Sequence, residues 1–146
     1  MEVAVYGDGR CFLRCLAAVL YPSLACAERF KSGQIRSVDI AAKETVVADL
    51  LRKEICNVLR EHRDVLHEMA DSLPFLLDNT VDRRFLSIDD RISAMSHPTT
   101  YVGNVEILVA AYLLRTQIHL FCSSPDGLKL VAKLPQTLYT LSKPVQ

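Results

Sequence analysis

The stretch YGDGRCFLRCLAAVL, residues 6–20, joins a glycine-rich turn directly to an apolar helix. Two glycines flank Asp8, and glycine allows sharp backbone turns that other residues resist. The apolar run that follows predicts a helix over residues 11–20, which ends before Pro22 because proline cannot continue a helix. Cys11 therefore begins a helix immediately after a tight turn. A cysteine that only fills a core needs no such setting.

This position of Cys11 favours the thiolate, which is the reactive form of cysteine. The unpaired N–H groups and the dipole at a helix N-terminus stabilise negative charge, and Arg10 adds a positive charge beside the sulfur. Gly7 and Gly9 let backbone N–H groups approach a reacting centre and form an oxyanion hole. Asp8 would brace the turn by accepting hydrogen bonds from its backbone. The alternative is an ordinary turn into a helix with a buried structural cysteine, because Gly-Asp-Gly alone has low specificity.

The composition indicates a folded globular domain. The chain has 146 residues, 50% of them hydrophobic and 23% charged, so it is long enough to bury a core and too apolar for disorder. Basic and acidic residues number 17 each, and a net charge of zero provides no overall basic field for nucleic acid or an anionic membrane. No apolar stretch is long enough to cross a bilayer, and no secretory signal is present. We expect one cytoplasmic domain over residues 1–146.

Helical periodicity predicts a long helix over about residues 40–62. Its apolar positions are Val46, Val47, Leu50, Leu51, Ile55, Val58 and Leu59. The charged residues from Arg52 to Arg63 are expected to form a solvated face of this helix. Residues 65–73 either continue it or form a second helix.

The remaining elements place strands late in the chain. Helices are predicted over residues 88–95 and 105–114, the second with Asn104 as its N-cap. Short extended segments are predicted at 3–6, 117–122, 128–132 and 138–141, with a turn at 124–127 that makes a hairpin of the middle two. Helices followed by a small sheet define the α+β class.

The five cysteines are expected to be reduced thiols, because their number is odd and the context is not secretory. Cys11 and Cys15 lie four residues apart on one helical face, a spacing that hints at metal or redox chemistry. No second pair stands at ligand spacing, so no metal is predicted, and a thiol redox protein would carry Cys-x-x-Cys. We expect Cys15, Cys26, Cys56 and Cys122 to fill the core.

The stretch MSHPTTYVGNVEILVAAYLLRTQIHLF, residues 95–121, supplies a second motif. Together with Gly-Asp-Gly-Arg-Cys at residues 7–11, it resembles the ovarian-tumour (OTU) family of cysteine peptidases over about residues 4–132. Members carry Gly-Asp-Gly-Asn-Cys at a helix start, then a Trp-Gly-Gly-like turn, an acidic helix start, an apolar helix and a strand ending in Ile-x-Val-Phe. The corresponding residues here are Tyr101-Val102-Gly103-Asn104, Glu106 and Ile118-His119-Leu120-Phe121. Two motifs in register are more specific than either alone.

The resemblance implies a papain-related cysteine protease fold in which helices flank a small β-sheet. It implies hydrolysis of the peptide or isopeptide bond after the C-terminal glycine of ubiquitin, with Cys11 as nucleophile. It also implies that Asp8 and the backbone N–H groups of Gly9, Arg10 and Cys11 shape the oxyanion site. Backbone donors tolerate a side-chain change, so Arg10 in place of the usual asparagine is compatible with this role.

The resemblance further implies the location of a substrate channel. Its candidate residues are His97, Tyr101, Gly103 and Asn104, and the absence of the usual tryptophan and one glycine changes the expected channel shape. A basic ubiquitin tail would need acids near the cleft, for which the candidates are Asp78, Asp82, Asp89 and Asp90. The expected partner is ubiquitin or a ubiquitin-like modifier, bound by a monomer without cofactor, metal, nucleic acid or membrane.

The resemblance does not extend to the catalytic histidine of the family. Family members carry it before an aromatic residue and Asp or Asn on a late strand, and none of His62, His67, His97 and His119 has that setting. The sequence ends in LYTLSKPVQ, about where the hairpin with this histidine would begin. Either the domain is incomplete at its C-terminus, which we favour, or it is a degenerate relative that binds ubiquitin or another protein without cleaving. In both cases we expect weak or no hydrolysis by this chain.

Overall fold

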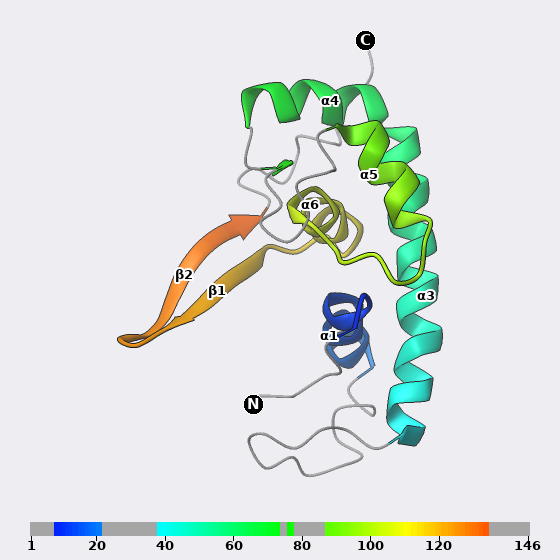
Figure 1. Cartoon of the computed structure of the whole chain (residues 1–146), viewed down its shortest axis with the longest axis vertical. Coiled ribbons are helices and arrows are strands. Elements are labelled where there is room, and N and C mark those ends of the chain that lie inside the picture. The colour runs from blue at the N-terminus through cyan, green and yellow to red at the C-terminus, as the bar shows by residue number, and fades with distance from the viewer. Residues whose placement is uncertain (1–7, 22–37, 74–75, 78–86, 135–146) are drawn as a thin grey trace. The chain divides into compact units, whose positions relative to one another are not determined.

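The computed structural model describes the chain over residues 8–21, 38–73, 76–77 and 87–134. Its helices are α1 (Cys11–Leu20), α3 (Val38–Glu61), α4 (Arg63–Ser72), α5 (Ile88–Met95) and α6 (Asn104–Leu113) (Figure 1). Its strands are β1 (Ile118–Ser124) and β2 (Gly127–Leu134). The predicted α+β class is confirmed at this level. No helix within these residues has the length and apolar character that a membrane span requires.

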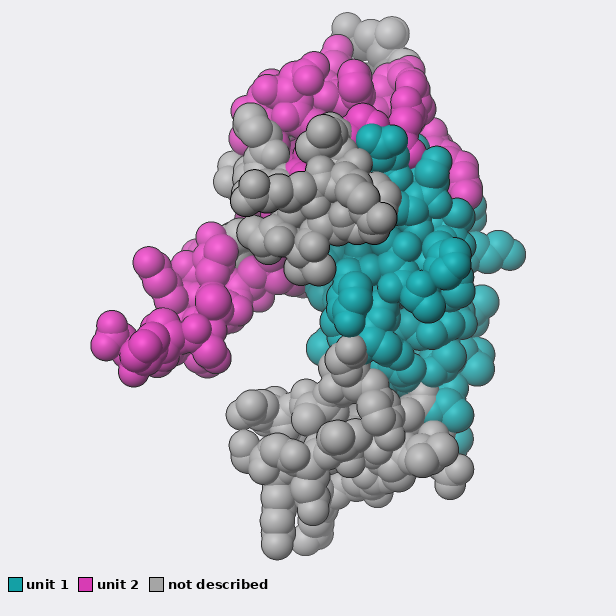
Figure 2. Space-filling view, in the orientation of Figure 1, with its two compact units in different colours: residues 1–57, 90–102 teal, residues 58–89, 103–146 magenta. Residues whose placement is uncertain are grey.

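The chain forms two compact units, which are coloured separately in Figure 2. The first comprises residues 1–57 and 90–102, and the second comprises residues 58–89 and 103–146. The first unit contains α1, most of α3 and most of α5, and it therefore holds the predicted nucleophile. The second contains α4, α6 and the β-hairpin.

Helix α1 has the bounds that the sequence predicts, and it is amphipathic. Leu13, Leu16 and Ala17 are buried on its inner side. The helix closes with the Tyr21 N–H donating to the Ala17 carbonyl at 2.9 Å. Cys15 is exposed on the other side, so the helix presents a cysteine to solvent where the sequence analysis expects a core residue.

Helix α3 turns a different side toward the core than its apolar periodicity predicts. Its inward positions in the first half are Glu44, Ala48 and Arg52, all buried and spaced four residues apart. Val46 and Leu50, predicted on the apolar side, are 62% and 60% exposed. The reason is that this half of α3 packs against polar groups of α1 and of the loop after α5. The later positions Ile55, Cys56, Val58 and Leu59 are buried, as predicted.

Residues 63–72 form a separate helix, α4, rather than a continuation of α3. His62 lies between the two helices, and its ring makes an edge contact with Tyr112 at a centroid distance of 5.7 Å. His62 is therefore half-buried instead of fully solvated.

Helix α6 begins one residue earlier than predicted. The sequence predicts Asn104 as the N-cap, whereas Gly103 occupies that position and Asn104 is the first helical residue. The cause is the buried Glu106 side chain, whose Oε1 accepts a hydrogen bond from the Gly103 N–H at 3.1 Å. Residues 105–111 are all buried, as expected of a helix that is apolar on every side.

The predicted hairpin is confirmed and extends further than expected. β1 and β2 pair antiparallel from Ile118 opposite Leu134 to the turn, with an irregularity between Leu120 and Phe121. Gly127 has φ +111°, a left-handed conformation that favours glycine. The segments 3–6 and 138–141, which the sequence predicts to be extended, lie outside the described residues.

The inward side of α3 can be tested by paired substitutions. Ile55→Ala should lower the free energy of unfolding by about 3 kcal/mol, because a fully buried side chain leaves a cavity. Leu50→Ala should cost less than about 0.5 kcal/mol, because Leu50 is largely exposed. Urea denaturation of both variants measures the difference. Equal losses would contradict the assigned inward side.

Candidate active site

The Asp8 side chain organises the turn that precedes α1. Its Oδ1 accepts a hydrogen bond from the Arg10 N–H at 3.1 Å, and the Asp8 carbonyl accepts one from the Cys11 N–H at 3.0 Å. The Arg10 carbonyl then accepts from the Arg14 N–H at 2.8 Å, which starts the helix. Asp8 therefore braces the turn, as the sequence predicts, and fixes Cys11 as the first helical residue.

These bonds determine which backbone donors are open to a substrate. The N–H groups of Arg10 and Cys11, two of the three predicted oxyanion donors, are already engaged by Asp8. The N–H groups of Phe12 and Leu13 lie in the first turn, where a helix offers no internal acceptor. An oxyanion at this end of α1 would use those first-turn donors or displace the bonds to Asp8.

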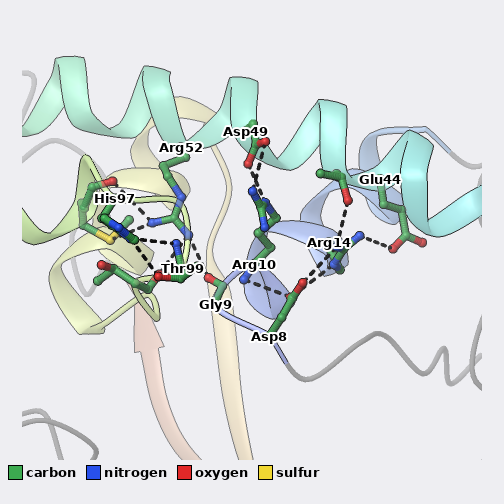
Figure 3. A network of polar contacts seen from close by, with 12 residues as sticks. Asp8, Gly9, Arg10, Arg14, Glu44, Asp49, Arg52, His97 and Thr99 are labelled. Carbon is green, nitrogen blue, oxygen red and sulfur yellow. Dashed lines mark hydrogen bonds and ion pairs between the residues drawn. The ribbon is translucent and has the colours of Figure 1, made fainter.

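The Asp8 carboxylate belongs to a charged network that joins α1 to α3 (Figure 3). The buried Arg14 guanidinium donates to Asp8 Oδ2 at 3.0 Å and to Thr45 Oγ1 at 2.8 Å. Its Nη1 lies 3.8 Å from the Glu44 carboxylate, which is fully buried. The Arg14 hydrogen bond lowers the pKa of Asp8 below its usual 3.8, against the opposing effect of burial. Asp8 therefore acts in this structure as a hydrogen-bond acceptor that positions the turn.

The Arg10 side chain does not direct its charge at the thiol. Its Nε donates to Asp49 Oδ1 at 2.7 Å and its Nη2 lies 3.4 Å from Asp49 Oδ2 (Figure 3). This pairing raises the pKa of Arg10 and places a negative charge against its guanidinium. The sequence-based expectation that Arg10 adds positive charge beside Cys11 is corrected accordingly.

Gly9 packs tightly against the loop that follows α5. A Cβ atom at this position would overlap the Thr99 carbonyl group and lie 2.8 Å from the Thr99 Cα. Both obstacles are backbone atoms, which cannot rotate away. Glycine is therefore required at position 9 by close approach of the two backbones.

Arg52 of α3 holds the same two segments together from inside. Its Nη2 donates to the Gly9 carbonyl at 2.8 Å and to the Thr100 carbonyl at 2.9 Å, and its Nη1 lies 3.4 Å from the Met95 carbonyl. The residue is 4% exposed. The expectation of a solvated face is therefore wrong at Arg52, because its guanidinium donates to carbonyls of two loops. The other charged residues of that face are exposed, as predicted: Lys53, Glu54, Arg60, Glu61 and Arg63.

A second buried arginine completes the support of the loop after α5. Arg91 donates from Nη2 to the Tyr101 carbonyl at 3.0 Å, and the Thr100 hydroxyl donates to the Ala94 carbonyl at 2.6 Å. These bonds fix the main chain of residues 96–101 and leave the Tyr101 ring 45% exposed. The predicted channel residue Tyr101 thus has a fixed backbone and a ring in contact with solvent.

Cys11 is partly exposed, so the residue is not sealed in the core. His97 belongs to the loop that packs on Gly9, and its exposed ring is hydrogen-bonded through Nδ1 to Thr99 Oγ1 at 2.8 Å. In the described part of this unit, the His97 ring makes no hydrogen bond with the Cys11 thiol. His97 therefore fits the cap or surface role that the sequence predicts.

Three of the other candidate residues, Gly103, Asn104 and Asp89, belong to the second unit. Gly103 and Asn104 begin α6 there. The Asp89 carboxylate accepts hydrogen bonds from Arg63 Nε at 2.5 Å and Nη2 at 2.7 Å, which lowers the pKa of Asp89. To bind a basic peptide tail, Asp89 would have to exchange this partner. Asp90, in the first unit, is exposed, and Asp78 and Asp82 lie outside the described residues.

The cysteines separate into buried and exposed classes. Cys56 is buried, as predicted. Cys15 and Cys122 are exposed, so the expectation that they fill the core is wrong. Cys15 faces away from the inner side of α1, and Cys122 lies on a strand of the exposed hairpin. Cys26 lies outside the described residues. Among the residues that the structure describes, no three Cys, His, Asp or Glu side chains are grouped to hold a metal ion.

The sequence analysis missed the buried polar residues that build this site. Glu44, Arg52 and Arg91 carry its internal support, yet charged residues in a helix are usually solvated. The available signal was the four-residue spacing of Glu44, Ala48 and Arg52, in which a small residue permits close packing between two polar ones.

No protein-family model, curated protein or solved structure matches the chain. The resemblance to the OTU family therefore rests on the two sequence motifs.

Replacement of Arg52 tests the internal support. Arg52→Met should lower the free energy of unfolding by about 3 kcal/mol, because it leaves the buried Gly9 carbonyl and the part-buried Thr100 carbonyl without this donor. Lys53→Met is the matched control, since the neighbouring Lys53 is exposed, and it should cost less than about 0.5 kcal/mol. Chemical denaturation measures both. A loss of stability in Arg52→Met as small as that in Lys53→Met would show that the guanidinium does not hold the two segments together.

The Asp8 brace predicts a specific pH dependence. A depressed folded-state pKa gives stability that is present above the unfolded value and lost as the pH falls through the folded value. Asp8→Asn should therefore cost about 0.5–1 kcal/mol at pH 7, a small effect because solvent screens this partly exposed carboxylate. The difference from the unmodified chain should begin to shrink near pH 3.8 and should disappear only below the lower pKa of Asp8 in the folded state. A difference that persists unchanged in acid would disprove the ionic brace.

Proposed function

We propose that the chain is a thiol-dependent deubiquitinase of the OTU type. The Cys11 thiolate attacks the carbonyl carbon of the C-terminal glycine of ubiquitin or a ubiquitin-like modifier. The tetrahedral intermediate collapses to a thioester and releases the amine, and water then cleaves the thioester and regenerates the thiol. The observation that carries the proposal is a partly exposed thiol at the first residue of a helix, after a turn braced by Asp8.

The surroundings of Cys11 support nucleophilic chemistry over a packing role. The N–H groups at the start of α1 would stabilise the oxyanion of the tetrahedral intermediate. The turn before it is held by Asp8, by Gly9 against Thr99, and by the Arg52 guanidinium. A structural thiol such as Cys56 is buried and has no need of this preparation.

Capture of an electrophile and complete hydrolysis place different demands on the chain. Capture requires a thiolate, whereas turnover also requires a base that accepts and donates protons. We expect this chain to capture a ubiquitin electrophile and to hydrolyse ubiquitin conjugates weakly or not at all. Robust turnover would mean that one of the four histidines serves as the base.

The second candidate function is a non-catalytic ubiquitin-binding or protein-interaction domain. The exposed apolar side chains of the hairpin favour it, because such surfaces often bind proteins. They are Phe121, Leu128, Leu130 and Val131. Either function is compatible with reduced thiols in the cytoplasm, which we propose as the location.

A ubiquitin carrying a C-terminal electrophile distinguishes these functions. The reduced chain should form a covalent adduct at Cys11, detected as a mass shift and located by peptide mapping. Cys11→Ser should abolish the adduct, whereas Cys122→Ser should leave it unchanged. A small alkylating agent provides the control for exposure alone, because it should label both Cys11 and Cys122. Adduct formation at Cys122 as fast as at Cys11 would favour the binding domain.

A further inference from the structure

We propose that Cys15 is a resolving thiol for Cys11, and that a peroxide converts the pair into a disulfide across the first turn of α1. The chemical event needs only the two thiols and the oxidant. Its consequence, reversible inactivation of the nucleophile, rests on the proposed function.

The helix brings both thiols to the same side. Residues four apart in an α-helix differ by about 40° in direction and about 6 Å in height. Leu13, Leu16 and Ala17 define the buried side, whereas Cys15 is exposed and Cys11 is partly exposed. A Cα separation of about 6 Å falls within the range that disulfides span. The oxidant and both sulfurs can therefore meet in solvent.

Closure of the bridge requires a local change that the end of a helix can make. The Cβ atoms of such a pair lie about 5–6 Å apart in a regular helix, and a disulfide needs about 4 Å. Cys11 is the first helical residue, and its N–H is held by one hydrogen bond to the Asp8 carbonyl at 3.0 Å. Bridging therefore strains the first turn, because the buried Leu13 and Arg14 lie between the two cysteines and hold its backbone. A disulfide under such strain is easily reduced, which suits a reversible switch.

The chemistry balances in two steps. The Cys11 thiolate attacks one oxygen of hydrogen peroxide, the O–O bond breaks, and the departing hydroxide takes a proton to become water. The Cys15 thiol then attacks the resulting sulfenic sulfur, the S–O bond breaks, and a second water leaves with the thiol proton. Two thiols and one peroxide thus give one disulfide and two waters.

The remaining cysteines provide controls. Cys56 is buried and should not react, and Cys122 is exposed on the hairpin, where it reports oxidation caused by exposure alone. Cys26 needs separate treatment, because trypsin cleaves after Arg14 and leaves Cys15 and Cys26 on one peptide, residues 15–29. Cys11 then lies on the peptide of residues 11–14.

The full chain is treated with hydrogen peroxide, blocked with an alkylating agent, digested and analysed by mass spectrometry without reduction. We expect the peptides 11–14 and 15–29 to be joined by a disulfide. The joined species should fall to background in Cys15→Ser and persist in Cys26→Ser and Cys122→Ser. Its persistence in Cys15→Ser would overturn the proposal, as would oxidation of Cys11 to sulfinic acid in the unmodified chain with no joined peptide.

Capture of the ubiquitin electrophile provides the second measurement. Peroxide should abolish capture, and a thiol reductant should restore it in the unmodified chain. In Cys15→Ser the loss should become irreversible, because an unresolved sulfenic acid proceeds to sulfinic acid, which thiols do not reduce. Full recovery in Cys15→Ser would overturn the role of Cys15. A reduced chain that captures no electrophile but forms the joined peptide would refute the proposed function and leave the disulfide standing.

Discussion

The Arg52 guanidinium is the interaction on which the candidate site depends. It is buried, and it donates hydrogen bonds to carbonyls on both sides of the site: Gly9 before α1 and Thr100 after α5. Charged donors give stronger hydrogen bonds than neutral ones, and the planar fork of arginine reaches two acceptors at once. Gly9 adds the steric condition, since only glycine admits the Thr99 backbone at this distance. The main chain around Cys11 is therefore fixed by contacts that do not involve the sulfur.

The same arrangement explains the electrostatics at the start of α1. Each arginine near the thiol has a partner: Arg14 binds Asp8 and approaches Glu44, and Arg10 binds Asp49. These pairs cancel most of the side-chain charge around the turn. The first-turn N–H groups and the helix dipole then remain as the groups that would face a negative charge developing at this end of α1. The proposed reactivity of Cys11 thus depends on backbone geometry more than on a neighbouring cation.

The helices and the hairpin were predictable because their signals are local. Proline after α1, the apolar spacing of α5 and α6, and the Ser-Pro-Asp-Gly turn each act within a few residues. The inward side of α3 was not predictable from apolar spacing, because Glu44 and Arg52 are buried against partners 30 and 43 residues away in the sequence. Likewise, Asp8 was predicted to brace the turn from its immediate neighbours, but its bond to Arg14 depends on the packing of α1 against α3. The exposure of Cys15 follows from the same packing, since Leu13, Leu16 and Ala17 occupy the inner side of α1.

The residues that hold the backbone are therefore different from the cysteines proposed to react. Arg52, Gly9 and the Asp8 brace hold the backbone, and a change in any of them alters stability whatever the chemistry of the thiol. Cys15 is exposed and Cys11 is partly exposed on the opposite side of α1, so we expect their substitution by serine to change reactivity more than stability. Thiol reactivity can therefore be measured independently of stability. If Cys15 were needed for packing, its replacement would destabilise the chain. We expect no such loss, because Cys15 is exposed and Leu13, Leu16 and Ala17 occupy the buried side of the helix.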